Sequence, residues 1–234
     1  MADLPINYLE LESIYARTIG SGLKSIAITS ALAREGVTTL AEALAKRVVA
    51  SGRKVLMVEL NVLHPDFTQR LGVSVKDWQL SKNEMPLSIL DIGEFCLLPA
   101  PIRTKSLLQL REQCLLKESI ELWLTKFDVV IIDTSPVNAV NRGNIPAEHV
   151  CAACDGVVFM VMAGATTESA IVEALNRLSS SDCRILGSVI NDKLNPSLAN
   201  ELIRETYRLE RWLPNMMNSL RNWIRYSNLL NVQI

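Results

Sequence analysis

The chain has 234 residues, of which 49% are hydrophobic and 21% are charged. This balance excludes a disordered chain, because burial of so much apolar surface offsets the conformational entropy lost on folding. The 24 basic residues nearly equal the 25 acidic ones, giving a formal net charge of -1, so no nucleic-acid partner is expected.

No segment of the sequence predicts insertion into a membrane or secretion. The longest uncharged, mainly apolar stretch lies between Asp155 and Glu168, well short of the roughly 20 residues that a membrane-spanning helix needs. The N-terminus lacks the basic and then apolar pattern of a secretory signal. Five scattered cysteines do not form a disulfide framework. We therefore expect a cytoplasmic protein whose thiols are reduced and mostly buried.

Short apolar runs rich in β-branched residues alternate along the chain with segments of helical periodicity. After an N-terminal helical segment (1–24), strands are predicted at 25–30, 54–59, 95–98, 127–133, 156–162 and 184–191, and helices at 38–50, 65–71, 105–126, 145–154 and 167–179. This alternation predicts an α/β fold, a doubly wound and mainly parallel sheet flanked by helices, over residues 25–200. Ligands bind such sheets beyond the carboxyl ends of the strands.

The end of the first strand carries the pattern of a phosphate-binding loop. The strand runs into Arg34, Glu35, Gly36, Val37, Thr38 and Thr39, where a helix begins. Backbone N–H groups and the helix dipole favour an anion in this context. However, Val37 stands where such a loop carries its lysine, and Arg34 stands where glycine is usual. Taken alone, the segment is equally consistent with a plain connection between a strand and a helix.

Polar residues also follow three later strands, at the same predicted edge of the sheet. The second strand ends in Glu59 and is followed by Asn61, and the last strand ends in Asn191. The strand that ends in Asp133 resembles a Walker B strand, whose carboxylate holds a magnesium-bound water. The four strand ends together favour a nucleotide site.

In this order, over roughly residues 20 to 192, the motifs resemble the cytoplasmic P-loop domain of bacterial tyrosine kinases. That family governs capsule and exopolysaccharide chain length and is related to the ParA/MinD ATPases. The resemblance implies an ATP or ADP site with Mg²⁺, in which Thr38 and Asp133 organise the metal and Glu59 and Asp133 are the catalytic carboxylates. It implies nucleotide contacts from Arg34, Glu35, Gly36, Val37, Thr38, Thr39, Asn61 and Asn191. It also implies a separate membrane-embedded polysaccharide co-polymerase, a chain-length regulator, as the partner.

The sequence departs from the family at positions where charge is critical. Val37 replaces the loop lysine, and Glu59 and Asn61 replace the two aspartates of the family's Asp-x-Asp motif. Phosphoryl transfer depends on positioned charge, and losing one preorganised donor costs about 100- to 1,000-fold in rate. We therefore expect little or no catalysis, with weak nucleotide binding surviving. Arg34 could supply the missing charge, since a guanidinium group suits phosphate.

Two further family features are incomplete. Autophosphorylating relatives end in a tyrosine-rich tail, whereas this chain has only the isolated tyrosines Tyr8, Tyr15, Tyr207 and Tyr226. Relatives also carry a Glu-x-x-Arg-x-x-Arg helix used in ring assembly. Glu12 matches the acidic residue of this motif, whereas Arg17 is an arginine at a displaced position. The sequence therefore leaves open whether the chain forms a homo-oligomer.

Two other patterns have a functional and a structural interpretation. His149, Cys151 and Cys154 offer closely spaced ligands that suit zinc, but no second cysteine pair completes the set, and we favour cysteines that act as small core residues. Segment 201–234 is basic and amphipathic, with apolar residues at helical spacing: Met216, Met217, Leu220, Trp223, Ile224 and Leu230. This stripe either packs on the core or docks on a partner or on the inner surface of the membrane.

Three functional hypotheses follow. The first is a degenerate, nearly inactive relative of the tyrosine kinases that regulates or scaffolds exopolysaccharide assembly and export in the cytoplasm. The second is a working ATPase or tyrosine kinase whose site is rebuilt with Arg34 and Glu59. The third is a MinD-like positioning ATPase that touches the inner membrane through segment 201–234.

Overall fold

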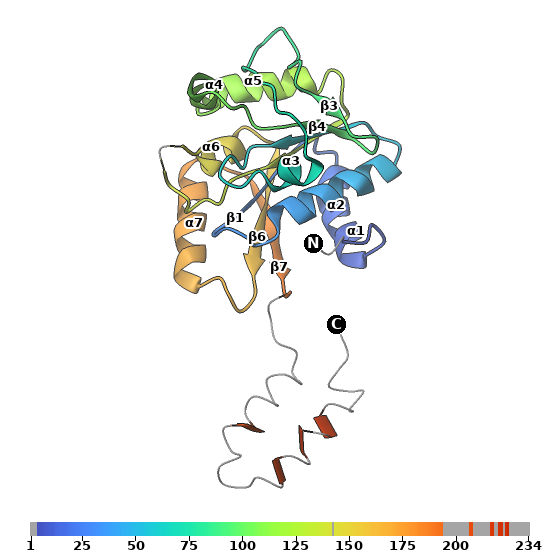
Figure 1. Ribbon diagram of the computed structural model, residues 1–234, viewed down its shortest axis with the longest axis vertical. Helices are drawn as coiled ribbons and strands as arrows, with labels where there is room; N and C mark the ends of the chain where they lie inside the picture. The colour runs from blue at the N-terminus through green and yellow to red at the C-terminus, as the bar shows by residue number, and fades with distance from the viewer. Residues whose placement is uncertain are drawn as a thin grey trace. The chain divides into compact units, whose positions relative to one another are not determined.

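The computed structural model describes residues 4–141, 143–193, 206–207, 216–217, 220–221 and 223–224. The chain divides into two compact units, Met1–Asn191 and Asp192–Ile234 (Figure 1). The sheet and its helices lie in the first unit. The domain boundary that the sequence predicts after residue 200 falls outside the described residues.

The first unit contains seven strands and seven α-helices among its described residues. The strands are β1 (Ser25–Ser30), β2 (Val55–Glu59), β3 (Leu90–Asp91), β4 (Cys96–Leu98), β5 (Val129–Asp133), β6 (Gly156–Met162) and β7 (Ile185–Asn191). The helices are α1 (Leu9–Arg17), α2 (Val37–Ala50), α3 (Asp66–Leu71), α4 (Thr104–Gln109), α5 (Gln113–Trp123), α6 (Ala147–Ala152) and α7 (Glu168–Ser180), and a 3-10 turn (Ile19–Ser21) follows α1.

The strands form one sheet in the order β3-β4-β2-β5-β1-β6-β7. All neighbouring pairs are parallel except β3 with β4, which is antiparallel. This confirms the predicted α/β fold with a doubly wound, mainly parallel sheet. Strand β5 lies between β1 and β2, so the carboxyl ends of these three strands meet at one edge, where the predicted site residues follow them.

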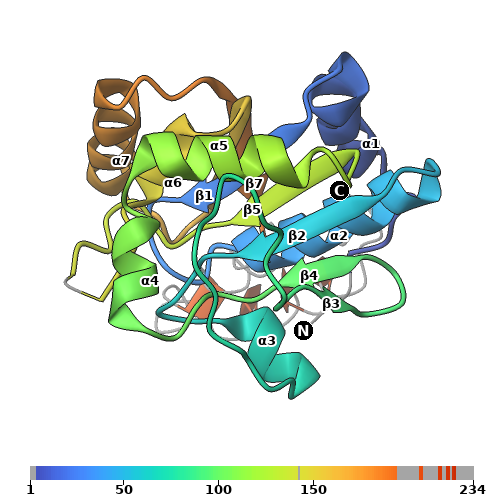
Figure 2. The same cartoon turned by 90° about the horizontal axis from the view of Figure 1, so that it is seen from above.

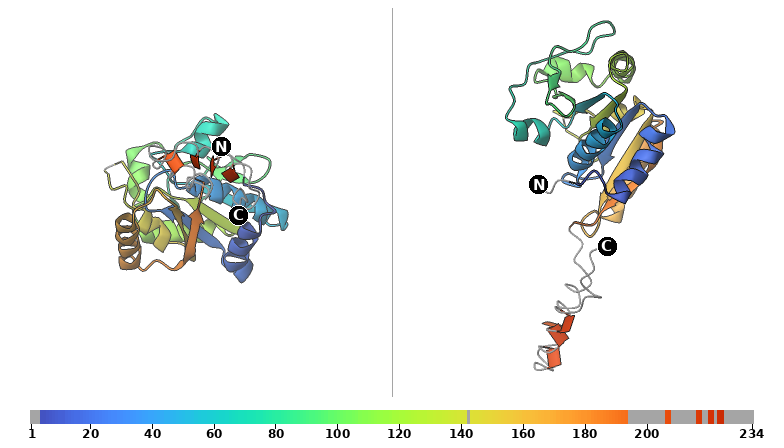
Figure 3. Two further views of the ribbon diagram at one scale, coloured as in Figure 1. Left: turned by 90° about the horizontal axis from the view of Figure 1, so that it is seen from below. Right: turned by 90° about the vertical axis from the view of Figure 1, so that its right-hand side faces the viewer.

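Helices cover both faces of the sheet, because alternate side chains of each strand point to opposite faces. On β1, Ile26 and Ile28 join the core shared with α1 and α2, whereas Ala27 joins the core shared with α6 and α7. Figures 1 and 3 show α6 and α7 on one side of the strands and α1 and α2 on the other. Helix α1 is further tied to α2 by Glu12, which accepts hydrogen bonds from Arg47, one of them at 2.9 Å.

The single helix predicted at 105–126 is wrong, because the structure has two helices there, α4 and α5 (Figure 2). Glu112 has an extended backbone and precedes α5. At the break between α4 and α5, Arg111 contacts the segment around α6. Its side chain donates to the Asn144 carbonyl at 2.8 Å, and its carbonyl lies 3.0 Å from Nδ1 of His149. The short edge strand β3 also went unpredicted, because two residues carry no periodicity.

Within the described part of the chain, no helix combines the length and the apolar character that crossing a bilayer requires.

The predicted C-terminal amphipathic segment, 201–234, lies largely outside the described residues. Its described residues are helical. Met217 and Ile224 are buried, whereas Met216 and Trp223 are exposed. The guanidinium group of Arg221, itself buried, lies 4.3 Å from the ring centre of Tyr207. Leu230 of the predicted stripe is not among the described residues.

Candidate functional site at the carboxyl ends of the strands

The loop between β1 and α2 contains two residues with a positive φ. Arg34 has φ 68° and Gly36 has φ 101°, so both adopt the left-handed region that favours glycine. The Gly36 carbonyl accepts a hydrogen bond from Leu40 N at 3.0 Å, which begins α2. The side chain of Arg34 is exposed. The loop thus forms a strand-to-helix turn despite a non-glycine residue at one strained position.

Val37, the first residue of α2, packs into the protein. Its side chain is 7% exposed and belongs to the core cluster that also includes Leu40, Met160 and Ile28. Thr39 beside it is half-buried. An ammonium group at position 37 would be costly to bury without a partner. The position of the missing lysine is therefore a packing position in this chain.

Thr38 and Asp133 lie together as the resemblance implies. The Thr38 hydroxyl donates to Asp133 Oδ2 at 2.6 Å, and both residues are buried. Burial raises the pKa of Asp133 to about 8, against the opposing effect of the Thr38 hydrogen bond, with Glu59 and Asp66 adding to the rise. Asp133 Oδ1 is buried and has no hydrogen-bond partner among the described residues. This pair keeps a hydroxyl and a carboxylate oxygen of the kind that Mg²⁺ prefers.

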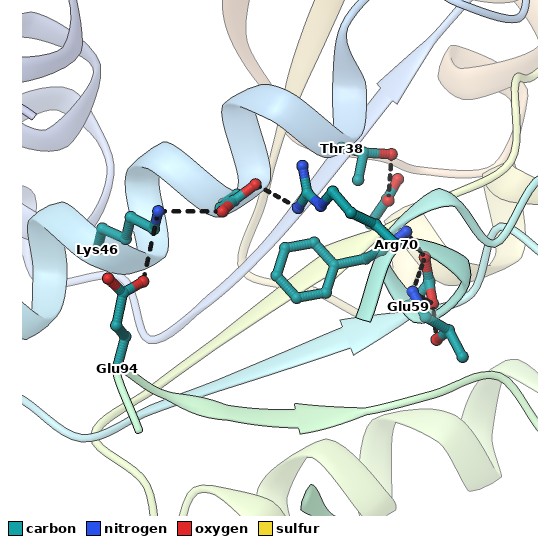
Figure 4. Close-up of polar contacts among 9 residues, drawn as sticks. Thr38, Lys46, Glu59, Arg70 and Glu94 are labelled. Carbon is teal, nitrogen blue, oxygen red and sulfur yellow. Dashed lines mark hydrogen bonds and ion pairs between the residues drawn. The ribbon is translucent and has the colours of Figure 1, made fainter. Parts of the chain in front are cut away.

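Glu59 is fully buried and caps helix α3 (Figure 4). Its carboxylate accepts hydrogen bonds from the N–H of Phe67 at 2.7 Å, the N–H of Thr68 at 3.1 Å and the Thr68 hydroxyl. Phe67 and Thr68 lie in the first turn of α3, where N–H groups have no partner within the helix. Burial raises the pKa of Glu59, and these three donors oppose the rise. The carboxylate that the resemblance implies in catalysis is thus engaged in holding α3.

Asn61 lies next to the same strand end and is 9% exposed. Its Oδ1 accepts from the His64 N–H at 3.3 Å and lies 3.5 Å from the Ser135 hydroxyl, which follows β5. The side chain therefore orders the turn between β2 and α3 and joins it to the Walker B-like strand.

Several ion pairs lie along the part of α2 that follows Thr38 (Figure 4). Arg70 of α3 donates to Glu42 at 2.5 Å and lies 4.6 Å from the ring centre of Phe67. Lys46 pairs with Glu42 at 3.1 Å and with Glu94 at 3.4 Å. Among the described residues on this face, the cations Arg70 and Lys46 are thus already paired with carboxylates.

The structure brings the predicted residues together at one edge of the sheet. Glu59 and Asp133 are directly paired across β2 and β5, and the Nδ2 group of Asn191 donates to the Glu35 carbonyl at 3.0 Å. Thr38 and Asp133 fit a magnesium ion, since Asp133 Oδ1 lacks a partner among the described residues. The phosphate side fits a triphosphate less well, because Val37 contributes no charge.

Sequence reasoning missed Thr68 and Thr166, which hold the carboxylates of Glu59 and Glu35 respectively. Pro65 precedes the first residue of α3, but nothing local marks Thr68 as the partner of Glu59. No local pattern marks Thr166, because its partner Glu35 lies in a distant part of the sequence.

The residues His149, Cys151 and Cys154 lie on or next to α6. Cys151 is fully buried, and the Cys154 thiol donates to the Val150 carbonyl at 3.4 Å. Burial raises the pKa of both thiols, that of Cys151 strongly. Over the described ranges, no cluster of three or more histidine, cysteine or acidic side chains is arranged to hold a metal ion.

Comparisons with known proteins agree with this geometry, although no family model matches the chain. Tyrosine-protein kinase YwqD of Bacillus subtilis (strain 168) is 28% identical over 185 residues, which are 73% of this chain and 73% of that protein. Tyrosine-protein kinase CpsD of Streptococcus agalactiae is 26% identical over 187 residues, 77% of this chain and 80% of that protein.

Solved structures show the same fold. The kinase domain of the Escherichia coli tyrosine kinase ETK superposes with a TM-score of 0.65 at 21% identity, covering 77% of this chain and 71% of that chain. Cobyrinic acid a,c-diamide synthase from Mycobacterium smegmatis, with a bound ATP analog and magnesium, gives 0.58 at 20% identity over 72% of each chain. The predicted resemblance to the bacterial tyrosine kinases is confirmed.

Proposed function

We propose that this chain is a degenerate relative of the bacterial tyrosine kinases that regulates or scaffolds exopolysaccharide or capsule assembly and export in the cytoplasm, with little or no catalysis. Its expected partner is a membrane-embedded polysaccharide co-polymerase made as a separate chain. The family resemblance supports a role in exopolysaccharide or capsule assembly. The geometry of the site supports the lack of ATP turnover.

The burial of Val37 in the core carries the proposal. A lysine at this position neutralises the terminal phosphates of the nucleotide, and positioned charge accounts for most of the catalysis in phosphoryl transfer. Val37 lies in the apolar cluster at the start of α2, and two nearby cations, Arg70 of α3 and Lys46 of α2, are paired with Glu42. The capping of α3 by Glu59 removes a second charge from the chemistry.

The test is ATP turnover by the purified full chain with Mg²⁺, measured as ADP release beside the active ETK kinase domain. We expect a rate at the buffer background, unchanged in Asp133→Asn. Turnover comparable with that of the active domain, and lost in Asp133→Asn, would contradict the proposal.

The intact pair of Thr38 and Asp133 favours one alternative, an ATPase or tyrosine kinase that uses Arg34 as its cation. The exposed Arg34 side chain is free of burial costs, and a guanidinium group binds phosphate in a bidentate manner. In that case Arg34→Ala abolishes phosphate release while Arg53→Ala, at an exposed arginine beyond α2, does not. Equal rates in the two variants would eliminate this alternative.

A further inference from the structure

The second compact unit, Asp192–Ile234, carries two helical faces of different character. Its described residues at 216–217, 220–221 and 223–224 are helical (Figure 1). Because an α-helix has 3.6 residues per turn, positions three or four apart lie on one face. The outer stripe consists of Met216, Leu220 and Trp223. The packed face, about 100° further around the helix, consists of Met217, Arg221 and Ile224.

Exposure separates the two faces. No residue of the packed face is more than 7% exposed. The guanidinium group of Arg221 lies 4.3 Å from the ring centre of Tyr207, a cation–π contact that ties this face to another described part of the same unit. In the outer stripe, Met216 is 62% exposed, Trp223 63% and Leu220 40%. The single apolar stripe that the sequence predicts is thus divided into a face that is packed and a face that is not.

The charges of the segment around the outer stripe have one sign. Residues 211–234 contain three arginines, Arg211, Arg221 and Arg225, and no acid, although the whole chain has a net charge of -1. An apolar stripe alone fits many surfaces, but cationic surroundings favour an anionic one. A bilayer with anionic lipids meets both requirements, because apolar side chains enter the boundary between headgroups and acyl chains while arginines attract the headgroups. Tryptophan is enriched at that depth.

We propose that the outer stripe is a docking surface for a membrane that contains anionic lipids. Met216, Leu220 and Trp223 enter the interface, and the arginines of the segment attract the anionic headgroups. The helix then lies in the plane of the membrane surface. The packed face keeps its contacts within the unit, so binding requires no unfolding. This inference goes beyond the proposed function and does not depend on whether the chain turns over ATP.

The test is co-sedimentation of the full chain with vesicles of phosphatidylcholine and phosphatidylglycerol. We expect the double variant Leu220→Ser/Trp223→Ser to lower the partition coefficient at least about tenfold, because it removes two large apolar side chains from the interface. The matched control is Leu87→Ser/Ile102→Ser, which removes two side chains that are 97% and 64% exposed in the first unit. This control is expected to bind as the wild type does.

Two further measurements use the same assay. Met216→Ser, at the third position of the outer stripe, is expected to lower the partition coefficient in the same direction as the double variant. Binding of the wild type is expected to weaken on vesicles of phosphatidylcholine alone and in about 1 M NaCl, which screens the attraction between arginines and headgroups.

The inference would be overturned if the wild type stayed in the supernatant, if the double variant bound as well as the wild type, or if the control lost binding equally. Equal binding to phosphatidylcholine alone would also overturn it. Sedimentation velocity without vesicles tests the competing occupant, a second copy of this chain. A wild-type dimer that the double variant dissociates would assign the outer stripe to self-association instead. Vesicle binding is measured separately from ADP release, so its failure leaves the proposed function unaffected.

Discussion

The Thr38 hydroxyl donates to Asp133 Oδ2 at 2.6 Å and joins the first turn of α2 to the end of β5 inside the protein. Removing the donor with Thr38→Val leaves a buried side-chain oxygen of Asp133 without its hydrogen bond. We expect a loss of about 1–3 kcal/mol in the free energy of unfolding, measured by urea denaturation. Thr39→Val, at the half-buried neighbouring position, is the control and is expected to cost less. Equal costs in the two variants would contradict a stabilising role for the hydrogen bond.

Stability is expected to fall as pH rises from about 4 to about 8, because Asp133 has its pKa raised to about 8 in the folded chain. The unfolded chain releases this proton near pH 4, so between these values the folded state binds more protons. The stabilising effect of the proton is complete below about pH 4 and is lost as pH passes through 8. Glu59 and Glu35, whose pKa values are also raised, act in the same direction.

The measurement is the urea midpoint between pH 5 and pH 9 for the wild type and Asp133→Asn. We expect a shallower fall in the variant, because asparagine does not titrate. An unchanged slope would show that Asp133 does not cause the pH dependence.

Shortening Glu59 by one methylene in Glu59→Asp should withdraw the cap from α3. The carboxylate would no longer reach the N–H groups of Phe67 and Thr68, and losing a helix cap costs about 0.5–2 kcal/mol. Hydrogen exchange at these two amides is expected to accelerate while the amides of β5 keep their protection. Glu84→Asp, at an exposed acid, is the matched control and should leave the α3 amides unchanged.

Val37→Ala tests whether position 37 serves packing. The valine is 7% exposed within the core cluster, and we expect the free energy of unfolding to fall by about 1–3 kcal/mol. The same change at the exposed Val140 should cost little. Urea denaturation measures the free energy of unfolding of both variants. An unchanged free energy in Val37→Ala would mean that the side chain is not packed as described.

The elements that the sequence predicts best are those decided by local pattern. Strands β1 and β6 begin and end at the predicted residues, because both are buried runs of apolar and β-branched residues. The break between α4 and α5 was not predictable, since helical periodicity continues across it and the cause is the contact of Arg111 with distant Asn144 and His149.

The candidate site likewise has features that the sequence predicts and features that it does not. The family resemblance implied that Thr38 and Asp133 lie in one site, and they meet because parallel strands end at the same edge. The use of Glu59 as a helix cap and the burial of Glu35 against Thr166 depend on which way long side chains turn, and spacing alone does not determine that direction.

The ion pair of Glu12 with Arg47 bears on self-association. In the resembling family the acid of this helix serves ring assembly, but here it is partnered within its own subunit. To bind a neighbouring copy, Glu12 would have to exchange Arg47 for an arginine of that copy. The net gain in free energy from this contact is therefore small. A partly exposed pair contributes only about 0–1 kcal/mol. Glu12 would therefore add little to the stability of any ring built through α1, and other contacts would have to hold the copies together.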